Sequence, residues 1–148
     1  HGLGRVRDVS TDFDLNINSS ASFDLSGNLL NVDEIVNELQ LNKSCNGEGE
    51  LKVGLTAIDF DKAFRKAKSI QENIFMKYGP FILDGTNCAR FVRTVVLKGM
   101  KPSIEKLFIA IPPMITPLPM WNVNAVREHI PANQTIDVVF ERYEAKTA

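Results

Sequence analysis

Residues 84–92 read Asp-Gly-Thr-Asn-Cys-Ala-Arg-Phe-Val, a turn-rich segment that leads directly into an amphipathic pattern. The Asp-Gly pair at 84–85 indicates a turn, and the Thr-Asn pair that follows supplies two residue types that cap helix N-termini. From residue 89 onward the apolar spacing fits one helix face up to a stop at Gly99. The pattern therefore predicts a helix that begins near residue 88 and holds Cys88 in its first turn.

A thiol in the first turn of a helix lies among unpaired backbone N–H groups at the positive end of the helix dipole. Such donors favour the thiolate, which is the nucleophilic form, so Cys88 is a candidate nucleophile. The alternative is that Cys88 is a small buried hydrophobic residue, the commoner role of a single cysteine beside apolar neighbours. Spacing alone leaves both interpretations open.

The run Asn-Cys-Ala-Arg-Phe-Val at 87–92, preceded by Tyr78 and followed by the predicted helix, resembles the Asn-Cys-x-x-Phe motif of circularly permuted NlpC-type, papain-like thiol hydrolases. Together with Gly-Arg-Val-Arg at 4–7 and Thr-Asp at 11–12, it is similar to a gut-bacterial branch of that group. The resemblance implies an α+β fold in which the cysteine nucleophile begins a helix. It also implies a small antiparallel sheet under the helix that supplies a histidine base.

The position of the histidine base differs between this sequence and the family that it resembles. In permuted members the histidine precedes the cysteine, on a Gly-His strand upstream of the Gly-Arg segment, whereas this sequence offers only His1 and His129. His129 follows Cys88 and is expected at a helix end or on the surface, so His1 is the candidate base. The alternative places the base upstream of His1. Residues 1–148 would then be the C-terminal part of a longer papain-like domain that lacks an N-terminal strand, and would be poorly active alone.

Four further residues are candidates for contacts with a substrate, by their position near Cys88 or in an apolar loop. Asp84 and Asn87 lie shortly before the thiol in the sequence, but both residue types are also common in turns and at helix caps. Tyr78 precedes it, but can equally end the apolar face of the preceding helix. Trp121 follows a segment rich in proline, which either walls a substrate groove or straps across the core; the strap is slightly favoured because aromatic side chains usually pack.

Composition narrows the classes of protein and partner. The 148 residues, 44% hydrophobic and 24% charged, predict one globular domain over 1–148. A formal net charge of −1 without a long basic run argues against nucleic-acid binding. No apolar run approaches the roughly 20 residues that span a bilayer. The sequence therefore predicts neither a nucleic-acid partner nor a transmembrane segment.

Two cysteines are too few to form a disulfide framework. Cys45 lies in a polar loop and Cys88 at a predicted helix start, which favours two free thiols and leaves one bridge between them open. Neither has metal-ligand spacing with a histidine, so we predict no metal site and no cofactor.

The remaining pattern predicts an α+β fold, a small antiparallel sheet with packed helices, because strands come in runs rather than in strict alternation with helices. An Asn-Glu capping box predicts the start of the first helix, and Asp59 is expected to cap the second. The predicted strands are 12–18, 20–25, 51–58 and 136–140, and the predicted helices are 31–40, 60–78, 88–99 and one from 122 or 124 to 129.

Two functions follow from these patterns. The first is a cysteine hydrolase, similar to a peptidase or amidase, that acts through Cys88 on a peptide or on another amide or ester bond. The second is a non-catalytic papain-like scaffold that serves as a binding or envelope-associated interaction module, with Cys88 retained in its core. The resemblance implies the bacterial cell envelope or secretion as the location, and the sequence itself leaves the compartment open. The sequence specifies neither the substrate nor the oligomeric state.

Overall fold

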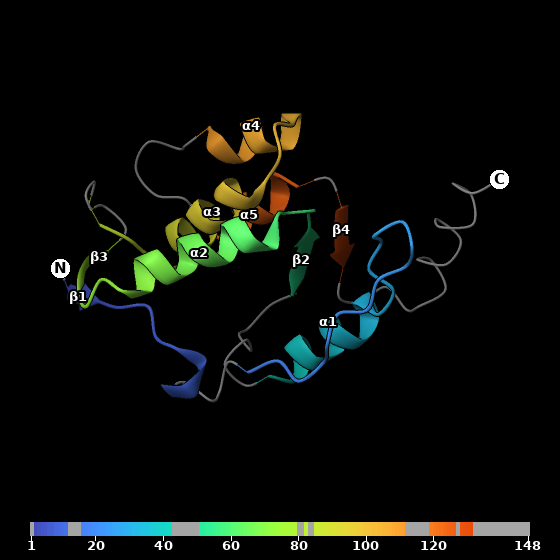
Figure 1. Cartoon of the computed structure of the whole chain (residues 1–148), viewed down its shortest axis with the longest axis horizontal. Helices are drawn as coiled ribbons and strands as arrows, with labels where there is room; N and C mark the ends of the chain where they lie inside the picture. Colours follow the sequence, from blue (N-terminus) through green and yellow to red (C-terminus); the bar gives the residue numbers. More distant parts are fainter. Residues whose placement is uncertain are drawn as a thin grey trace. The chain divides into compact units, whose positions relative to one another are not determined.

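The computed structural model describes residues 2–11, 16–42, 51–79, 82, 85–111, 119–126 and 128–131 (Figure 1). These residues combine helices with short strand pairs, so the predicted α+β class is confirmed and is consistent with a small papain-like fold. The elements in chain order are β1 (Gly2–Gly4), the 3-10 turn η1 (Val9–Thr11), α1 (Val32–Leu41), β2 (Lys52–Leu55), α2 (Phe60–Gln71), β3 (Met76–Tyr78), α3 (Cys88–Gly99), α4 (Ile104–Ala110), α5 (Pro119–Asn124) and β4 (Glu128–Pro131).

The chain divides into two compact units. The first comprises His1–Asp8 and Gly54–His129, and the second comprises Val9–Val53 and Ile130–Ala148. Strand β1 pairs with β3 in antiparallel register, and β2 pairs with β4. The prediction of a single domain over 1–148 stays a prediction. Within the described ranges, no helix is both long and apolar enough to cross a bilayer.

Helices α2 and α3 pack together in the first unit (Figure 1). The C-terminal end of α3 meets the start of α2 at Gly99, whose carbonyl accepts a 2.9 Å hydrogen bond from the backbone N–H of Asp59. A Cβ added at Gly99 would lie 3.0 Å from the Asp59 carbonyl oxygen and 3.1 Å from the Cβ of Ala63. Close approach of the two helices therefore depends on the absence of a side chain here.

The hydrophobic core of the first unit is formed by residues from the end of α3, from α4 and from the residues after α5. Met100, Ile109 and Val126 are buried together, with Val96, Leu97 and Ala125 packed against them. Arg93 reaches from α3 to the end of α4, where its Nε and a terminal nitrogen donate to the last carbonyls at 2.8 and 2.6 Å. Because the last carbonyls of a helix lack intrahelical partners, this side chain fixes α4 against α3.

Side-chain caps begin helices α2 and α4 of the first unit. Asp59 accepts from the N–H of Lys62 at 3.0 Å, as predicted, and Ser103 accepts from the N–H of Lys106 at 3.1 Å. The apolar run at 105–111 that follows Ser103, which the sequence leaves unassigned, forms α4.

The predicted helix 60–78 is too long. Helix α2 ends at Gln71, and residues 76–78 form β3 instead. Ile74 and Phe75 fit the helical spacing, yet their side chains are 73% and 64% exposed, so they do not extend the buried face of α2. Backbone pairing of β3 with β1 replaces the helical hydrogen bonds that the spacing predicted.

The predicted hairpin over 12–25 is also wrong where it can be compared. Residues 12–15 lie outside the described residues, and 16–25 contain one bridge, from Phe23 to Leu29 around a turn at Gly27 with φ of +84°. The predicted first helix is confirmed as α1. However, Asn31 makes no side-chain cap bond, and its amide instead donates to Glu34 at 3.0 Å.

The other strand and helix predictions differ mainly at their ends. The strand predicted over 51–58 is confirmed in part, as the shorter β2. The helix predicted to reach residue 129 is wrong, because α5 ends at Asn124 and residues 128–131 form β4. The strand predicted at 136–140 lies outside the described residues.

Candidate active site

Cys88 is the first residue of α3, as predicted. The side chain of Asn87 caps the helix, since its Oδ1 accepts from the backbone N–H of Arg90 at 2.8 Å. Cys88 is a free, exposed thiol rather than a buried core residue. Because Asn87 takes only one of the first N–H groups of the helix, others remain near the sulfur as potential donors.

The hydroxyl of Tyr78 lies 3.3 Å from the Cys88 sulfur, within hydrogen-bond distance for sulfur. This hydrogen bond and the charge of the Cys88 sulfur, with a small contribution from burial, raise the pKa of Tyr78 above its usual value of 10. Tyr78 therefore keeps its proton throughout the neutral range and can donate a hydrogen bond to the sulfur.

Backbone pairing brings Tyr78 to Cys88. The segment at 85–86 runs beside β3: the N–H of Thr86 donates to the Lys77 carbonyl at 2.8 Å, and the N–H of Gly79 donates to the Thr86 carbonyl at 3.1 Å. A Cβ added at Gly85 would lie 2.6 Å from the Lys77 carbonyl oxygen, so only glycine allows this approach. The turn before α3 is thus fastened to the strand that carries Tyr78.

Strand β1 lies on the other side of β3. Gly2 is opposite Tyr78 and Gly4 is opposite Met76 in the antiparallel register. A Cβ added at Gly4 would lie 2.9 Å from Cδ2 and 3.0 Å from Cβ of Tyr78, so the backbone at Gly4 packs directly against this side chain. Tyr78 is therefore held between β1 and the segment that leads into Cys88.

Two further residues fix the first turn of α3. A guanidinium nitrogen of Arg90 donates to the carbonyl of Ile82 and, at 3.1 Å, to that of Gly85, which ties the helix to the preceding loop. From α5, the amide of Asn122 donates to the Ala89 carbonyl at 2.9 Å. Sequence reasoning missed both roles. Arg90 lies inside the recognised motif, whereas nothing in the sequence pattern around Asn122 points to α3.

The predicted site residues divide into three groups. The structure brings Tyr78, Asn87 and Cys88 together. Trp121 lies on α5 and is 43% exposed, next to the residue that reaches α3. His1 and Asp84 lie outside the described residues.

The described residues contain no group of three or more His, Cys, Asp or Glu side chains that could hold a metal ion. The candidate site is therefore an exposed thiol at a helix start, beside a tyrosine hydroxyl. The loop before the helix and a residue from α5 hold its first turn in place.

Comparison with known proteins identifies a family for most of the chain. The family model described as "Type VI secretion system effector TseH-like" matches residues 1–104. No curated protein matches, and no solved structure does. The matched range contains β1, β3 and all of α3. It therefore includes Tyr78, the two segments that flank its strand, and Cys88. The chain belongs to the family of TseH-like type VI secretion system effectors.

Proposed function

We propose that this effector is a cysteine hydrolase of amide or ester bonds with Cys88 as its nucleophile. The observation that carries the proposal is the exposed Cys88 sulfur at the start of α3, 3.3 Å from the Tyr78 hydroxyl. A helix N-terminus and a neighbouring hydroxyl donor both favour a thiolate. The resemblance of residues 87–92 to the NlpC-type motif supports the same assignment.

The reaction would proceed through a thioester. The Cys88 thiolate attacks the carbonyl carbon, a C–S bond forms, and the carbonyl oxygen takes the negative charge. The backbone N–H of Cys88, at the start of α3, is a candidate donor to this oxyanion. The general base has taken the proton of the Cys88 thiol before the attack, and it gives this proton to the amine or alcohol as that group leaves. The base then takes a proton from a water molecule, which attacks the thioester carbonyl, breaks the C–S bond, releases the acid and restores the thiolate.

Tyr78 has a distinct role at each stage. Before attack its hydroxyl donates to the sulfur and stabilises the thiolate. Once the sulfur has formed the C–S bond it is a weak acceptor, so the same hydroxyl can turn to the oxyanion. Its raised pKa suits a donor rather than a base, because a neutral hydroxyl gives up its proton poorly near pH 7.

The general base is proposed to be His1. Gly2, its neighbour in the sequence, lies opposite Tyr78 in the β1–β3 pair, and this register supports the choice. A strand upstream of His1 is the other source of an imidazole, as the permuted NlpC-type pattern implies. His1→Ala in the 1–148 chain separates the two: loss of hydrolysis supports His1. A chain without activity in either form, restored by native upstream sequence, supports the second source.

The substrate class comes from the same resemblance. We propose peptides of the bacterial cell wall, or related amide or ester compounds, and action at the cell envelope or after secretion. The effector family favours a protein that leaves the cell that makes it.

The first experiment measures the reactivity of the thiol. In a Cys45→Ser background, Cys88 is the only cysteine, and intact mass follows its alkylation by iodoacetamide at pH 7.5. We expect alkylation about tenfold faster than in the same chain unfolded in urea, as is typical of reactive thiols at helix N-termini. Equal or slower alkylation in the folded chain would contradict the proposal and leave the non-catalytic scaffold.

The second experiment measures hydrolysis directly. Purified cell-wall peptides are incubated with the chain and with Cys88→Ser, and the products are separated by mass. Release of a new acid and amine by the native chain alone supports the proposal. Equal release by both chains assigns the activity to a contaminant.

A further inference from the structure

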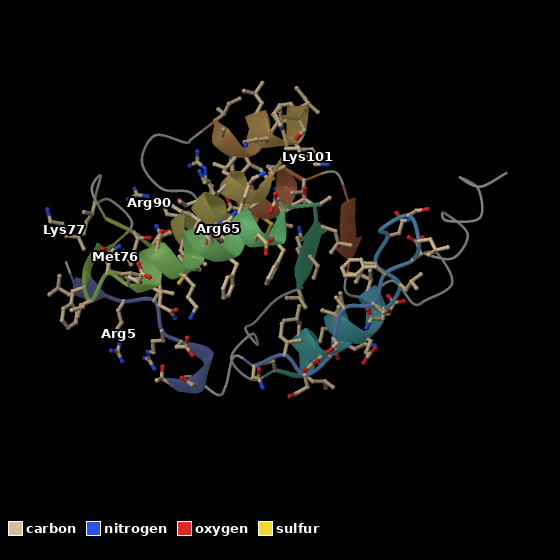
Figure 2. All side chains as sticks on the ribbon, in the orientation of Figure 1. Arg5, Arg65, Met76, Lys77, Arg90 and Lys101 are labelled. Atoms are coloured by element: carbon tan, nitrogen blue, oxygen red, sulfur yellow. The ribbon has the colours of Figure 1, made fainter. Side chains whose placement is uncertain are left out.

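The two units of this protein carry opposite charges. Ranges 1–8 and 54–129 contain 13 Lys and Arg against seven Asp and Glu, a formal charge of +6, whereas 9–53 and 130–148 contain four against eleven, a charge of −7. The net charge of −1 conceals this division. Cys88 belongs to the positive unit, and Figure 2 labels five cations of the same unit: Arg5, Arg65, Lys77, Arg90 and Lys101.

A depression lies against Tyr78 in the positive unit. Its lining residues come from β1 and the residues that follow it, from the residue before β3, and from β3 itself. They are Leu3, Gly4, Arg5, Arg7, Phe75 and Tyr78. Leu3 and Phe75 are 72% and 64% exposed, so their apolar surfaces are open to a ligand. Tyr78 is both a wall of this depression and the hydrogen-bond neighbour of the Cys88 sulfur.

The described part of the lining carries two cationic side chains. Arg5 and Arg7 are exposed, and none of the described lining residues is acidic. Asp8, the next residue along the chain, accepts from Lys68 at 3.0 Å, so a lysine of α2 compensates its charge. Glu72 is exposed at the end of α2, three residues before Phe75, and is outside the lining.

We propose that this depression is a substrate subsite for an oxyanion, carboxylate or phosphate, joined to the scissile bond through an apolar segment. The inference rests on the proposed function, because it assigns the depression to the substrate of Cys88. Guanidinium groups bind carboxylate and phosphate through paired hydrogen bonds, and Leu3 and Phe75 offer contact to the apolar segment. Tyr78 joins this subsite to the thiol.

Affinity labelling tests the subsite without knowledge of the substrate. The probe is 6-(iodoacetamido)hexanoate, an iodoacetamide with an apolar linker and a terminal carboxylate. Its neutral twin carries a terminal primary amide, and a third compound carries a phosphate. In each case the Cys88 sulfur forms a bond to the CH₂ carbon, iodide leaves, and the thiol proton passes to solvent.

Rates are measured at low salt in the Cys45→Ser background and divided by the rates of the same probes with free cysteine. We expect the carboxylate or the phosphate probe to label Cys88 about tenfold faster than the neutral twin, as for charge-assisted contacts to arginine. The faster of the two identifies the oxyanion. Saturation with probe concentration is expected for the anionic probe alone.

Variants locate the effect. Arg5→Gln and Arg7→Gln should each lower the rate of the anionic probe about fivefold and leave the rate of the neutral twin unchanged. The control is Lys98→Gln, which removes the same charge from the last turn of α3, about 15 Å along the helix from Cys88. It should leave the ratio of the two probes unchanged. An equal fall in all three variants would show a general field and overturn the subsite.

Binding without labelling separates this proposal from the proposed function. N-acetyl-6-aminohexanoate or the matching phosphate is titrated into Cys88→Ser, and the backbone amide signals of residues 3–7 are followed by NMR. Saturable shifts that disappear in Arg5→Gln support the subsite even if Cys88 proves unreactive. Absence of shifts at millimolar ligand overturns the subsite, whatever the reactivity of the thiol.

Discussion

The Tyr78 hydroxyl and the Cys88 sulfur lie 3.3 Å apart although ten residues separate them in the sequence. Two backbone pairings produce this proximity. One joins the strand of Tyr78 to Thr86, and the other joins the same strand to β1. The thiol and its hydroxyl partner are therefore positioned by main-chain geometry, which does not depend on the substrate.

Removal of the Tyr78 hydroxyl should slow the reaction of the thiol. One hydrogen bond contributes about 1 kcal/mol, so Tyr78→Phe is expected to reduce the rate of Cys88 alkylation at pH 7.5 about fivefold. The measurement is intact mass against time in the Cys45→Ser background. Tyr143→Phe, which changes the only other tyrosine, is the control. A rate unaffected by Tyr78→Phe would show that the hydroxyl does not assist the sulfur.

Ionisation of Tyr78 should report the same contact from the other partner. Its pKa is raised by the hydrogen bond to Cys88 and by the charge of that sulfur, so Tyr78 should ionise at higher pH than an ordinary tyrosine. In a Tyr143→Phe background, absorbance at 295 nm follows Tyr78 alone. Cys88→Ala should bring the midpoint back toward 10. Identical midpoints with and without the sulfur would rule out the coupling.

The two glycines of β1 provide a matched pair of variants. A Cβ at Gly4 would meet Tyr78 at 2.9 Å, whereas a Cβ at Gly2 would meet nothing within 4 Å. Gly4→Ala should displace the Tyr78 ring and lower stability by about 1–3 kcal/mol, the usual cost of overpacking. It should also slow alkylation of Cys88. Gly2→Ala should be neutral in both urea unfolding and alkylation. If both variants behave alike, the packing of β1 against Tyr78 is not what positions the ring.

The start of α3 could be predicted from sequence because its determinants are local. Asn87 supplies the cap, Gly99 ends the helix, and the apolar spacing lies between them, all within 13 residues. The end of α2 could not be predicted in this way. Ile74 and Phe75 satisfy helical spacing. The helix nevertheless ends before them, because the next residues form β3, which pairs with β1 more than 70 positions earlier in the chain.

The same distinction applies to the candidate site. Tyr78 was named from its place before the motif, but its contact with the sulfur depends on Gly85 and Gly4, whose close approaches are tertiary. Asn122 reaches Ala89 from 33 positions away, and no local pattern marks that bond. The opposite charges of the two units were hidden for a related reason: the units interleave along the chain, so no single segment displays either charge.

The cap of α3 should have separable effects on stability and reactivity. Asn87→Ala removes the bond to the N–H of Arg90 and should lower stability by about 1 kcal/mol in urea unfolding. Asn87→Asp keeps the cap and should leave stability unchanged or slightly higher, since a carboxylate suits a helix N-terminus. Its charge beside Cys88 opposes a thiolate, so alkylation should be slower. Equal alkylation rates in the Asp variant and the native chain would mean that local charge does not control the thiol.

In the second unit, Glu38 should make stability depend on pH. Its carboxylate accepts from the backbone N–H groups of Asn18 at 2.5 Å and Ser19 at 2.8 Å, and these bonds lower its pKa from 4.5 to about 2. A lowered pKa in the folded state stabilises the fold above the unfolded value of 4.5. This contribution is lost as the pH falls from about 4.5 to about 2.

Glu38→Gln should therefore lower the melting temperature at pH 7, and the difference from the native chain should shrink as the pH falls through that window. Thermal unfolding at half-unit steps from pH 2 to 7 measures it. Glu34→Gln, which removes the same charge from the exposed first turn of α1, should cost less at pH 7 because, among the described residues, Glu34 accepts from the side chain of Asn31 and from no backbone N–H. A difference for Glu38→Gln that stays constant from pH 7 to 2 would show that the ionised carboxylate does not hold residues 18–19 against α1.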